Sequence, residues 1–154
     1  MPEGDGAIYD SFKGEVMKGT FNLDTAGDAL HLTLHKGYSP APKTHSAWAD
    51  AGVSSTEYGT QNGYTADGKI LGSQAVTTDT SNDRGKFDAA DVTWTALGPL
   101  TPTTATPSHC ILWDNTVAAA PVDALIAYWI LGATATNGGD YTIQWGANGI
   151  ILLT

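Results

Sequence analysis

The sequence predicts an all-β protein, a β-sandwich or jelly-roll-like barrel with one short N-terminal helix and an N-terminal arm. Three observations predict this fold. The 154 residues include 18 glycines and 7 prolines, which implies many turns and short strands. Only 15% of the residues are charged, which is low for a helical bundle with solvated outer faces. Several strand-length segments are either alternating or continuously apolar.

The length is that of one domain, which we expect over residues 7–154 after a polar arm at residues 1–6. Residues 37–68 carry no strong periodic signal and are expected to form an irregular excursion. Such a long segment inside a compact domain indicates a functional or intersubunit role. Residues 98–107, rich in threonine and proline, predict an exposed extended loop.

The first periodic segment is helical. Ile8, Phe12 and Val16 recur at the spacing of one helix face and predict a short amphipathic helix over residues 7–18. Gly19 follows the last turn and is a plausible stop.

The next segment alternates. Between residues 30 and 35, three leucines alternate with His31, Thr33 and His35, which predicts a strand with one buried and one solvated face. The two histidines would lie about 13 Å apart on this strand, which is too far for the metal pair that the same spacing gives on a helix.

Residues 85–97 predict a corner between two sheets. Phe87 ends one strand and the alternating run through Trp94 begins the next, with an acidic step between them. We expect Asp88 or Asp91 to cap backbone amides at the bend.

The remaining strands show the same two patterns. The continuously apolar ones must be covered on both faces, by a second sheet or by another chain. These strands are predicted at residues 69–78, 110–113, 124–131, 141–145 and 150–153, with a hairpin turn at Ala147-Asn148-Gly149.

Charge and cysteine content exclude several classes of protein. The formal net charge of −9 with scattered basic residues argues against nucleic-acid binding. No apolar run approaches the roughly 20 residues of a membrane span, so we expect no membrane partner. The single cysteine, Cys110, has apolar neighbours and is expected to be a buried structural thiol in a protein made in a reducing compartment.

A search for catalytic or metal-binding patterns finds none that fits. The acidic residues from Asp79 to Asp91 fail an EF-hand register, because Arg84 occupies the glycine position and Ala90 the glutamate position. An irregular oxygen-ligand site there stays open, with solvated turn carboxylates as the default. We therefore expect no catalytic residues, no cofactor and no metal site.

Aromatic residues in the excursion form a separate hypothesis. Trp48, Tyr58 and Tyr64 lie in a loop-like segment, whereas the other four tryptophans lie on predicted strands. An exposed cluster of these three rings would serve as a protein contact or as a carbohydrate platform.

Five segments together form a recognisable pattern. They are the helical segment Ile8 to Lys18, the alternating segment Ala29 to His35, Phe87-Asp88-Ala89-Ala90-Asp91-Val92-Thr93-Trp94, Leu125-Ile126-Ala127-Tyr128 and Gly138-Gly139-Asp140-Tyr141-Thr142-Ile143-Gln144-Trp145-Gly146-Ala147-Asn148-Gly149-Ile150. This pattern resembles a family of small structural proteins of tailed bacteriophage virions, of the capsid decoration (cement) type. The resemblance spans most of the chain and is strongest from residue 85 onward, whereas residues 37–68 match it only loosely.

The resemblance implies an assembly role without enzymatic activity. A protein of this kind is made in the host cytoplasm, forms a homotrimer and binds the major capsid protein on the outer surface of the virion. The arm, the excursion and the Pro/Thr loop are the candidate contact segments. The candidate interface residues are Pro2, Glu3, Tyr38, Trp48, Tyr58, Tyr64 and Pro102.

Other functions stay open at this point. The same domain would serve as a tail- or baseplate-associated structural protein. A surface carbohydrate-binding module would use Trp48 or Tyr58, and a small β-fold enzyme would use Asp88 or Asp91.

Overall fold

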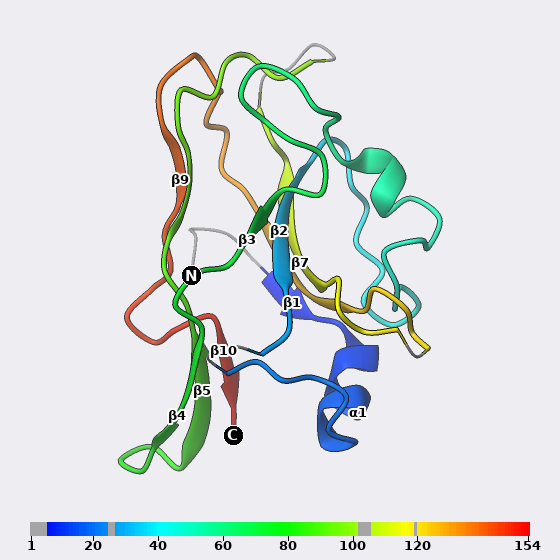
Figure 1. Cartoon of the computed structure of the whole chain (residues 1–154), viewed down its shortest axis with the longest axis vertical. Coiled ribbons are helices and arrows are strands. Elements are labelled where there is room, and N and C mark those ends of the chain that lie inside the picture. The colour runs from blue at the N-terminus through cyan, green and yellow to red at the C-terminus, as the bar shows by residue number, and fades with distance from the viewer. Residues whose placement is uncertain (1–5, 25–26, 102–105, 119) are drawn as a thin grey trace.

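A computed structural model describes residues 6–24, 27–101, 106–118 and 120–154 (Figure 1). The described part is all-β apart from one α-helix, α1 (Asp10–Met17), and one 3₁₀ turn, η1 (Ser54–Thr56). The predicted all-β class is therefore confirmed. The strands are β1 (Gly6–Ile8), β2 (Leu30–His35), β3 (Lys69–Ile70), β4 (Ala75–Asp79), β5 (Arg84–Asp88), β6 (Val92–Trp94), β7 (His109–Asp114), β8 (Leu125–Ile130), β9 (Tyr141–Ile143) and β10 (Ile151–Leu153).

These strands form three antiparallel sheets. The largest has the order β1-β8-β7-β2-β3, the second has the order β10-β5-β4, and the third pairs β6 with β9. None of the three closes on itself within the described ranges, so the sheets are open rather than a closed barrel.

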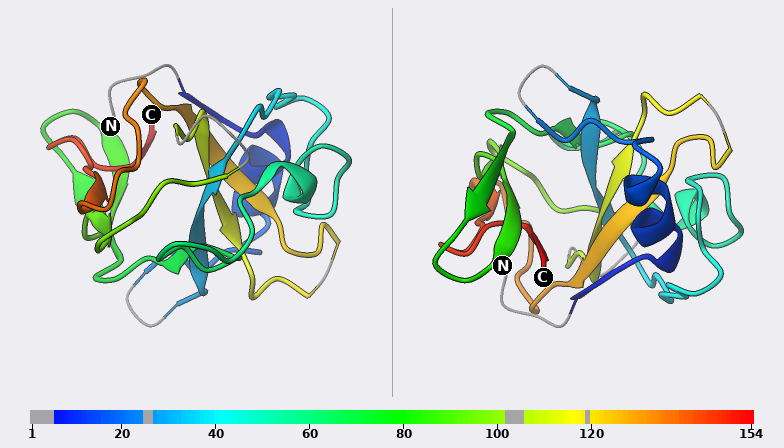
Figure 2. Two further views of the ribbon diagram at one scale, coloured as in Figure 1. Left: turned by 90° about the horizontal axis from the view of Figure 1, so that it is seen from above. Right: turned by 90° about the horizontal axis from the view of Figure 1, so that it is seen from below.

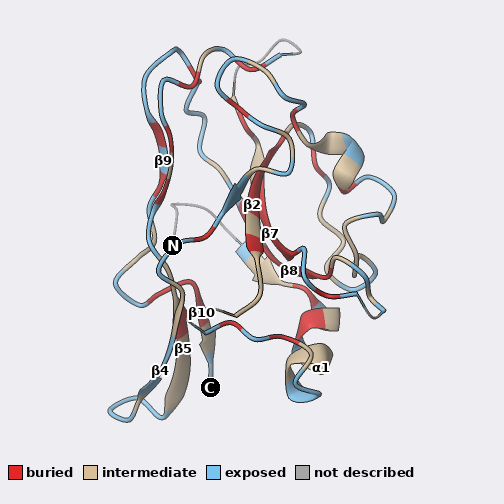
Figure 3. Cartoon of the chain, in the orientation of Figure 1, coloured by how far each residue is buried: buried red, intermediate tan, exposed pale blue. Residues whose placement is uncertain are grey.

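The sheets are stacked in layers. Viewed from above and below, the five-stranded sheet lies in the middle of the molecule (Figure 2). The two smaller sheets lie on one side of it. On the other side lie η1 and the irregular chain around it. The central strands β2 and β7 are consequently buried along most of their length (Figure 3).

The inner face of the five-stranded sheet carries the main core. The leucines of β2 are fully buried there, as their alternation predicts, and Cys110 on β7 lies beside them as a buried free thiol. The smaller sheets contribute Phe87 and Trp94, which are 3% and 1% exposed. Burying such side chains is the main driving force for stacking the layers.

The outer face of the same sheet is also covered, which corrects the prediction of a solvated face. Thr33 and His35 are both fully buried, and only His31 is partly exposed. The first part of the excursion, residues 38–57, folds back over this face, and we call this irregular segment the outer cover. Lys36 N donates to Thr56 O at 2.9 Å, and His35 forms an isolated β-bridge with Glu57. The sequence did not predict the outer cover because an irregular segment has no periodic pattern.

The corner predicted at residues 85–97 is confirmed. β5 pairs with β4 and β10, whereas β6 pairs with β9 in another sheet. Asp88 caps an amide at the bend as predicted, because Ala89 N donates to Asp88 Oδ1 at 3.0 Å. Asp91 instead binds the chain after β9, where Trp145 N donates to Asp91 Oδ1 at 2.9 Å.

The hairpin predicted at Ala147-Asn148-Gly149 is wrong, although a turn is present there. Gly149 N donates to Gly146 O at 2.8 Å, but β9 and β10 do not pair with each other. They pair with β6 and β5, because those two strands already belong to different sheets on either side of the corner.

Three boundaries also differ from the prediction. The strand predicted at residues 69–78 is broken into β3 and β4 by a turn at Ser73, whose φ is +54°. The helix is shorter than predicted and ends before Gly19, whose φ of +73° fits a helix stop. Gly6, assigned to the arm, pairs with Trp129 in β1.

Candidate functional site

Three of the predicted interface residues cannot be placed in the structure. Pro2, Glu3 and Pro102 lie outside the described residues. Their role stays a prediction.

Tyr38 and Trp48 lie in the cover over the outer face of the five-stranded sheet. The Trp48 ring stacks on Trp113 of β7, with centroids 4.5 Å apart and planes 11° apart. The Tyr38 hydroxyl lies 2.6 Å from the hydroxyl of Tyr9 and 2.9 Å from Nδ1 of His45. These contacts hold the irregular segment onto the sheet, and Tyr38 is only 4% exposed.

Tyr58 and Tyr64 belong to the opposite, inner core. The Tyr64 ring stacks on Trp94 at 6.1 Å, and its hydroxyl donates to Glu57 Oε1 at 2.7 Å while it accepts from Leu34 N at 3.0 Å. Burial raises the pKa of Glu57 to about 7.

The predicted exposed aromatic cluster is therefore wrong. Tyr58 and Tyr64 expose at most 1% of their surface, so neither ring can stack on a sugar or a partner. Trp48 packs on the other face of the sheet, where it is partly buried and stacks on Trp113. The chain uses these rings as internal packing.

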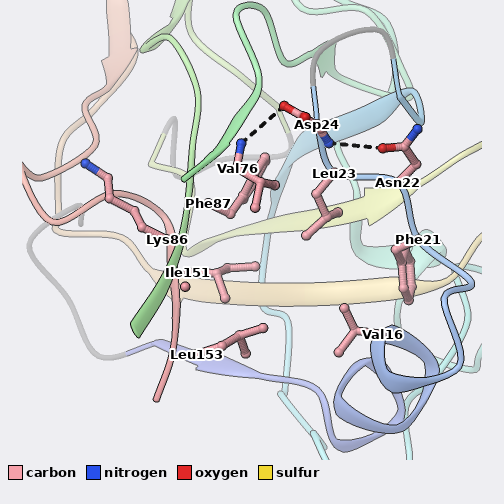
Figure 4. Close-up of a pocket in the computed structure, with 11 residues that line it drawn as sticks. Val16, Phe21, Asn22, Leu23, Asp24, Val76, Lys86, Phe87, Ile151 and Leu153 are labelled. Atoms are coloured by element: carbon pink, nitrogen blue, oxygen red, sulfur yellow. Dashed lines mark hydrogen bonds between the residues drawn. The ribbon is translucent and has the colours of Figure 1, made fainter. Parts of the chain in front are cut away.

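An apolar pocket beside the C-terminal strand is the stronger candidate. It has a volume of about 340 Å³, and we call it the β10 groove (Figure 4). Its side chains come from α1, the chain after α1, β4, β5 and β10, and they point toward one another. The apolar lining is Val16, Phe21, Leu23, Val76, Phe87, Ile151 and Leu153.

Strand pairing produces this groove. Ile151 lies opposite Phe87, and Leu153 lies opposite Gly85, so β5 presents no side chain next to Leu153. The hollow between β10 and the chain after α1 therefore stays partly open, and Val76 and Leu153 remain 49% and 45% exposed.

The polar groups at the groove are engaged in local structure. Val76 N donates to Asp24 Oδ1 at 3.4 Å, and Asp24 N donates to Asn22 Oδ1 at 3.3 Å (Figure 4). Lys86 Nζ forms an ion pair with Asp88 at 3.0 Å and donates to Ala147 O. What the groove offers a ligand is apolar surface with a polar rim.

The opposite side of β10 is hollow as well. A second pocket of about 540 Å³ lies there, between β10 and the strands β1 and β8. β10 and β1 are each the outermost strand of their sheets in the described part of the chain. An outermost strand has backbone N–H and C=O groups that can pair with a strand of another chain.

Sequence analysis missed the β10 groove because its lining comes from separate segments. Each segment carries one or two apolar residues, and only their pairing brings them together. The exposed apolar residues Val76 and Leu153 indicate a binding surface only when the strand order shows that they lie beside the same groove.

The acidic residues at residues 79–91 do not gather into an oxygen-ligand site. Asp79 forms an ion pair with Arg84 at 2.8 Å, Asp88 binds Lys86, and Asp91 caps Trp145. Across the residues that the structure describes, no three His, Cys, Asp or Glu side chains lie close enough together to hold a metal.

The described part of the chain contains no helix with the length and apolar character needed to cross a membrane. No protein-family model, no curated protein and no solved structure matches the chain.

Proposed function

We propose that the chain is a structural protein of a tailed-phage virion, a decoration protein that binds the major capsid protein on the outer capsid surface. The proposal starts from the sequence resemblance. The structural observation that best supports it is the β10 groove, an apolar hollow beside an outermost strand. A surface of this kind suits docking of a protein segment more than it suits chemistry on a small substrate.

The mechanism is stabilisation of an assembled state. A protein that binds the assembled shell and not its separated subunits shifts the equilibrium toward the shell. Val76 and Leu153 are about half exposed, so covering them contributes roughly 1 kcal/mol each. Three copies in a trimer would bind together, and their effects would multiply through avidity. The trimer and the jelly-roll arrangement are part of this proposal.

Capsids stripped of accessory proteins test the function directly. Purified protein is added, unbound protein is removed, and the particles are imaged. We expect ordered density at local threefold positions of the shell. Density on tails alone would contradict the decoration role and favour the tail or baseplate alternative.

A pair of matched variants tests the surface. Leu153→Asp puts a charge on the rim of the β10 groove, and we expect capsid binding to fall at least tenfold. Ile70→Asp is the control, since Ile70 is 60% exposed on β3 and belongs to another sheet. Circular dichroism checks that both variants fold. Equal binding by both variants would contradict the role of the groove.

A further inference from the structure

Three histidines surround one tyrosine ring where the outer cover meets the five-stranded sheet. The centroid of the Tyr38 ring lies 5.7 Å from that of His35 on β2 and 5.5 Å from that of His109 on β7. His45, within the outer cover, lies 5.9 Å from the same ring. Tyr38 and His35 are both buried. The outer cover is therefore joined to the sheet by side chains of the type whose charge changes just below neutral pH.

A chain of hydrogen bonds in this cluster is complete only when Nδ1 of His45 carries no proton. The Tyr9 hydroxyl lies 2.6 Å from that of Tyr38, which in turn lies 2.9 Å from His45 Nδ1. With a neutral ring, Tyr9 donates to Tyr38 and Tyr38 donates to Nδ1. A protonated His45 would donate instead, and one of the two hydroxyl protons would then have no acceptor. Tyr9 is fully buried, so this loss would destabilise the closed cover.

His35 is paired with hydroxyl groups. Its Nε2 lies 2.9 Å from Thr33 Oγ1, and its Nδ1 lies 3.0 Å from Thr56 Oγ1 in the outer cover. Neutral hydroxyls satisfy the hydrogen bonds of the ring, but they do not compensate a buried charge. Burial lowers the pKa of both His35 and His109, and a charge on His109 would also repel one on His35. The closed cover therefore favours neutral rings.

Asp50 is the carboxylate that faces the cluster from the outer cover. It accepts from Ser46 N at 2.6 Å and from Ala47 N at 2.9 Å, and its charge partly offsets a charge on His45. We therefore expect His35 and His109 to produce most of the response to acid. Glu57 ends the outer cover, but its carboxyl group accepts from Tyr64 in the inner core. Further ionisable side chains beside the outer cover are Tyr128, Lys36, Asp10, Lys13 and Lys43.

The outer cover has no strand ladder to hold it in place. It is joined to the end of the sheet by separate backbone bonds, from Trp48 N to Asp123 O and from Leu125 N to Ser46 O, each 2.9 Å long. The strands beneath it are paired residue by residue in the β2–β7 and β7–β8 ladders. Gly37, with a φ of +61°, precedes the outer cover and can act as its hinge. The outer cover can therefore open while the sheet stays intact.

We propose that the outer cover is an acid-released strap: protonation of the histidines around Tyr38 frees residues 38–57 from the five-stranded sheet while the inner core stays closed. The freed segment takes up protons that the closed one excludes. The closed form therefore loses stability as the pH falls below about 6.5, the ordinary pKa of histidine. Opening would expose the outer face of the sheet, where Ile111 and Leu125 are fully buried.

Hydrogen exchange followed by mass spectrometry tests the strap. Exchange is compared between about pH 7 and about pH 4.5, after correction for the intrinsic effect of pH on amide exchange. We expect the protection of residues 38–57 to fall about tenfold per pH unit for each proton taken up, while β7 keeps its protection. His35→Gln and His109→Gln should each weaken this pH dependence. His31→Gln is the control, because His31 lies on the same face of β2 but contacts Trp113 instead of Tyr38.

The outcomes separate local release from general unfolding. Equal loss of protection in the outer cover and in β7 overturns the proposal, and so does an outer cover whose protection does not change with pH. A His31→Gln variant that loses the acid response as fully as His35→Gln would also contradict it. If His35→Gln does not fold, the partly exposed His109 still allows His109→Gln to decide. None of these measurements depends on the capsid proposal.

Discussion

The two faces of the five-stranded sheet are buried by different means. The inner face packs leucines and Cys110 against two smaller sheets, and its interactions are mainly apolar. The outer face lies under an irregular segment, and its rings are joined by hydrogen bonds among Tyr9, Tyr38 and His45. The stability of the inner core therefore depends on the volume and shape of its side chains. The stability of the outer cover depends on hydrogen bonds between polar side chains and on their protonation state.

Loss of a large ring should damage the inner face most. Trp94→Ala removes a side chain that is 1% exposed, and we expect the free energy of unfolding to fall by about 3–5 kcal/mol. Trp94→Phe is the matched control and should cost less, because indole Nε1 has no hydrogen-bond partner among the described residues. Urea unfolding measures both, and an unchanged midpoint in Trp94→Ala would refute the corner as a core anchor.

Acid should loosen the outer cover. Burial, and secondarily His109, lowers the pKa of His35 from 6.5 to about 3, so the folded protein holds this ring neutral. The unfolded chain takes up the proton below pH 6.5, so stability is lost as the pH falls from 6.5 toward 3. The loss is about 1.4 kcal/mol per pH unit, or roughly 2–3 kcal/mol two units below 6.5.

The His35→Gln variant isolates this effect. Glu57 acts in the opposite direction, because its raised pKa adds stability as the pH falls from 7 to 4.5. The difference between wild type and His35→Gln cancels that contribution. Thermal melting at several pH values should show the two proteins converging in acid, whereas parallel curves would mean that His35 is not held neutral.

The smallest effect is expected from one hydroxyl of the outer cover. Tyr38→Phe removes the group that lies between Tyr9 and His45, and we expect a cost of about 1 kcal/mol. Hydrogen exchange should increase in the irregular segment and not in β2. Tyr128→Phe is the control on the same face, and an equal cost in both variants would contradict a specific role for the Tyr38 hydroxyl.

The two faces also differ in how far the sequence predicts them. The alternation of leucines predicts the inner face of β2, and the acidic step between Phe87 and Trp94 predicts the corner, because both depend on local patterns. The burial of Thr33 and His35 depends on a distant segment that folds back without periodicity. Burial cannot be predicted from alternation alone when the covering chain is irregular.

The β10 groove was missed for the same reason. It joins residues from separate parts of the chain, so its apolar lining appears only with the strand order. Pro2, Glu3 and Pro102 stay predictions, as do the capsid partner and the trimer.

The buried thiol of Cys110 allows the opening of the inner core to be measured by chemical labelling. Burial raises the pKa of this thiol, and the sequence has no other cysteine. A thiol-specific reagent can therefore react only after the inner layers separate. The rate of labelling therefore measures how often the inner core opens, and movements confined to the outer cover do not change it. The native cysteine serves as the probe, so no engineered one is needed.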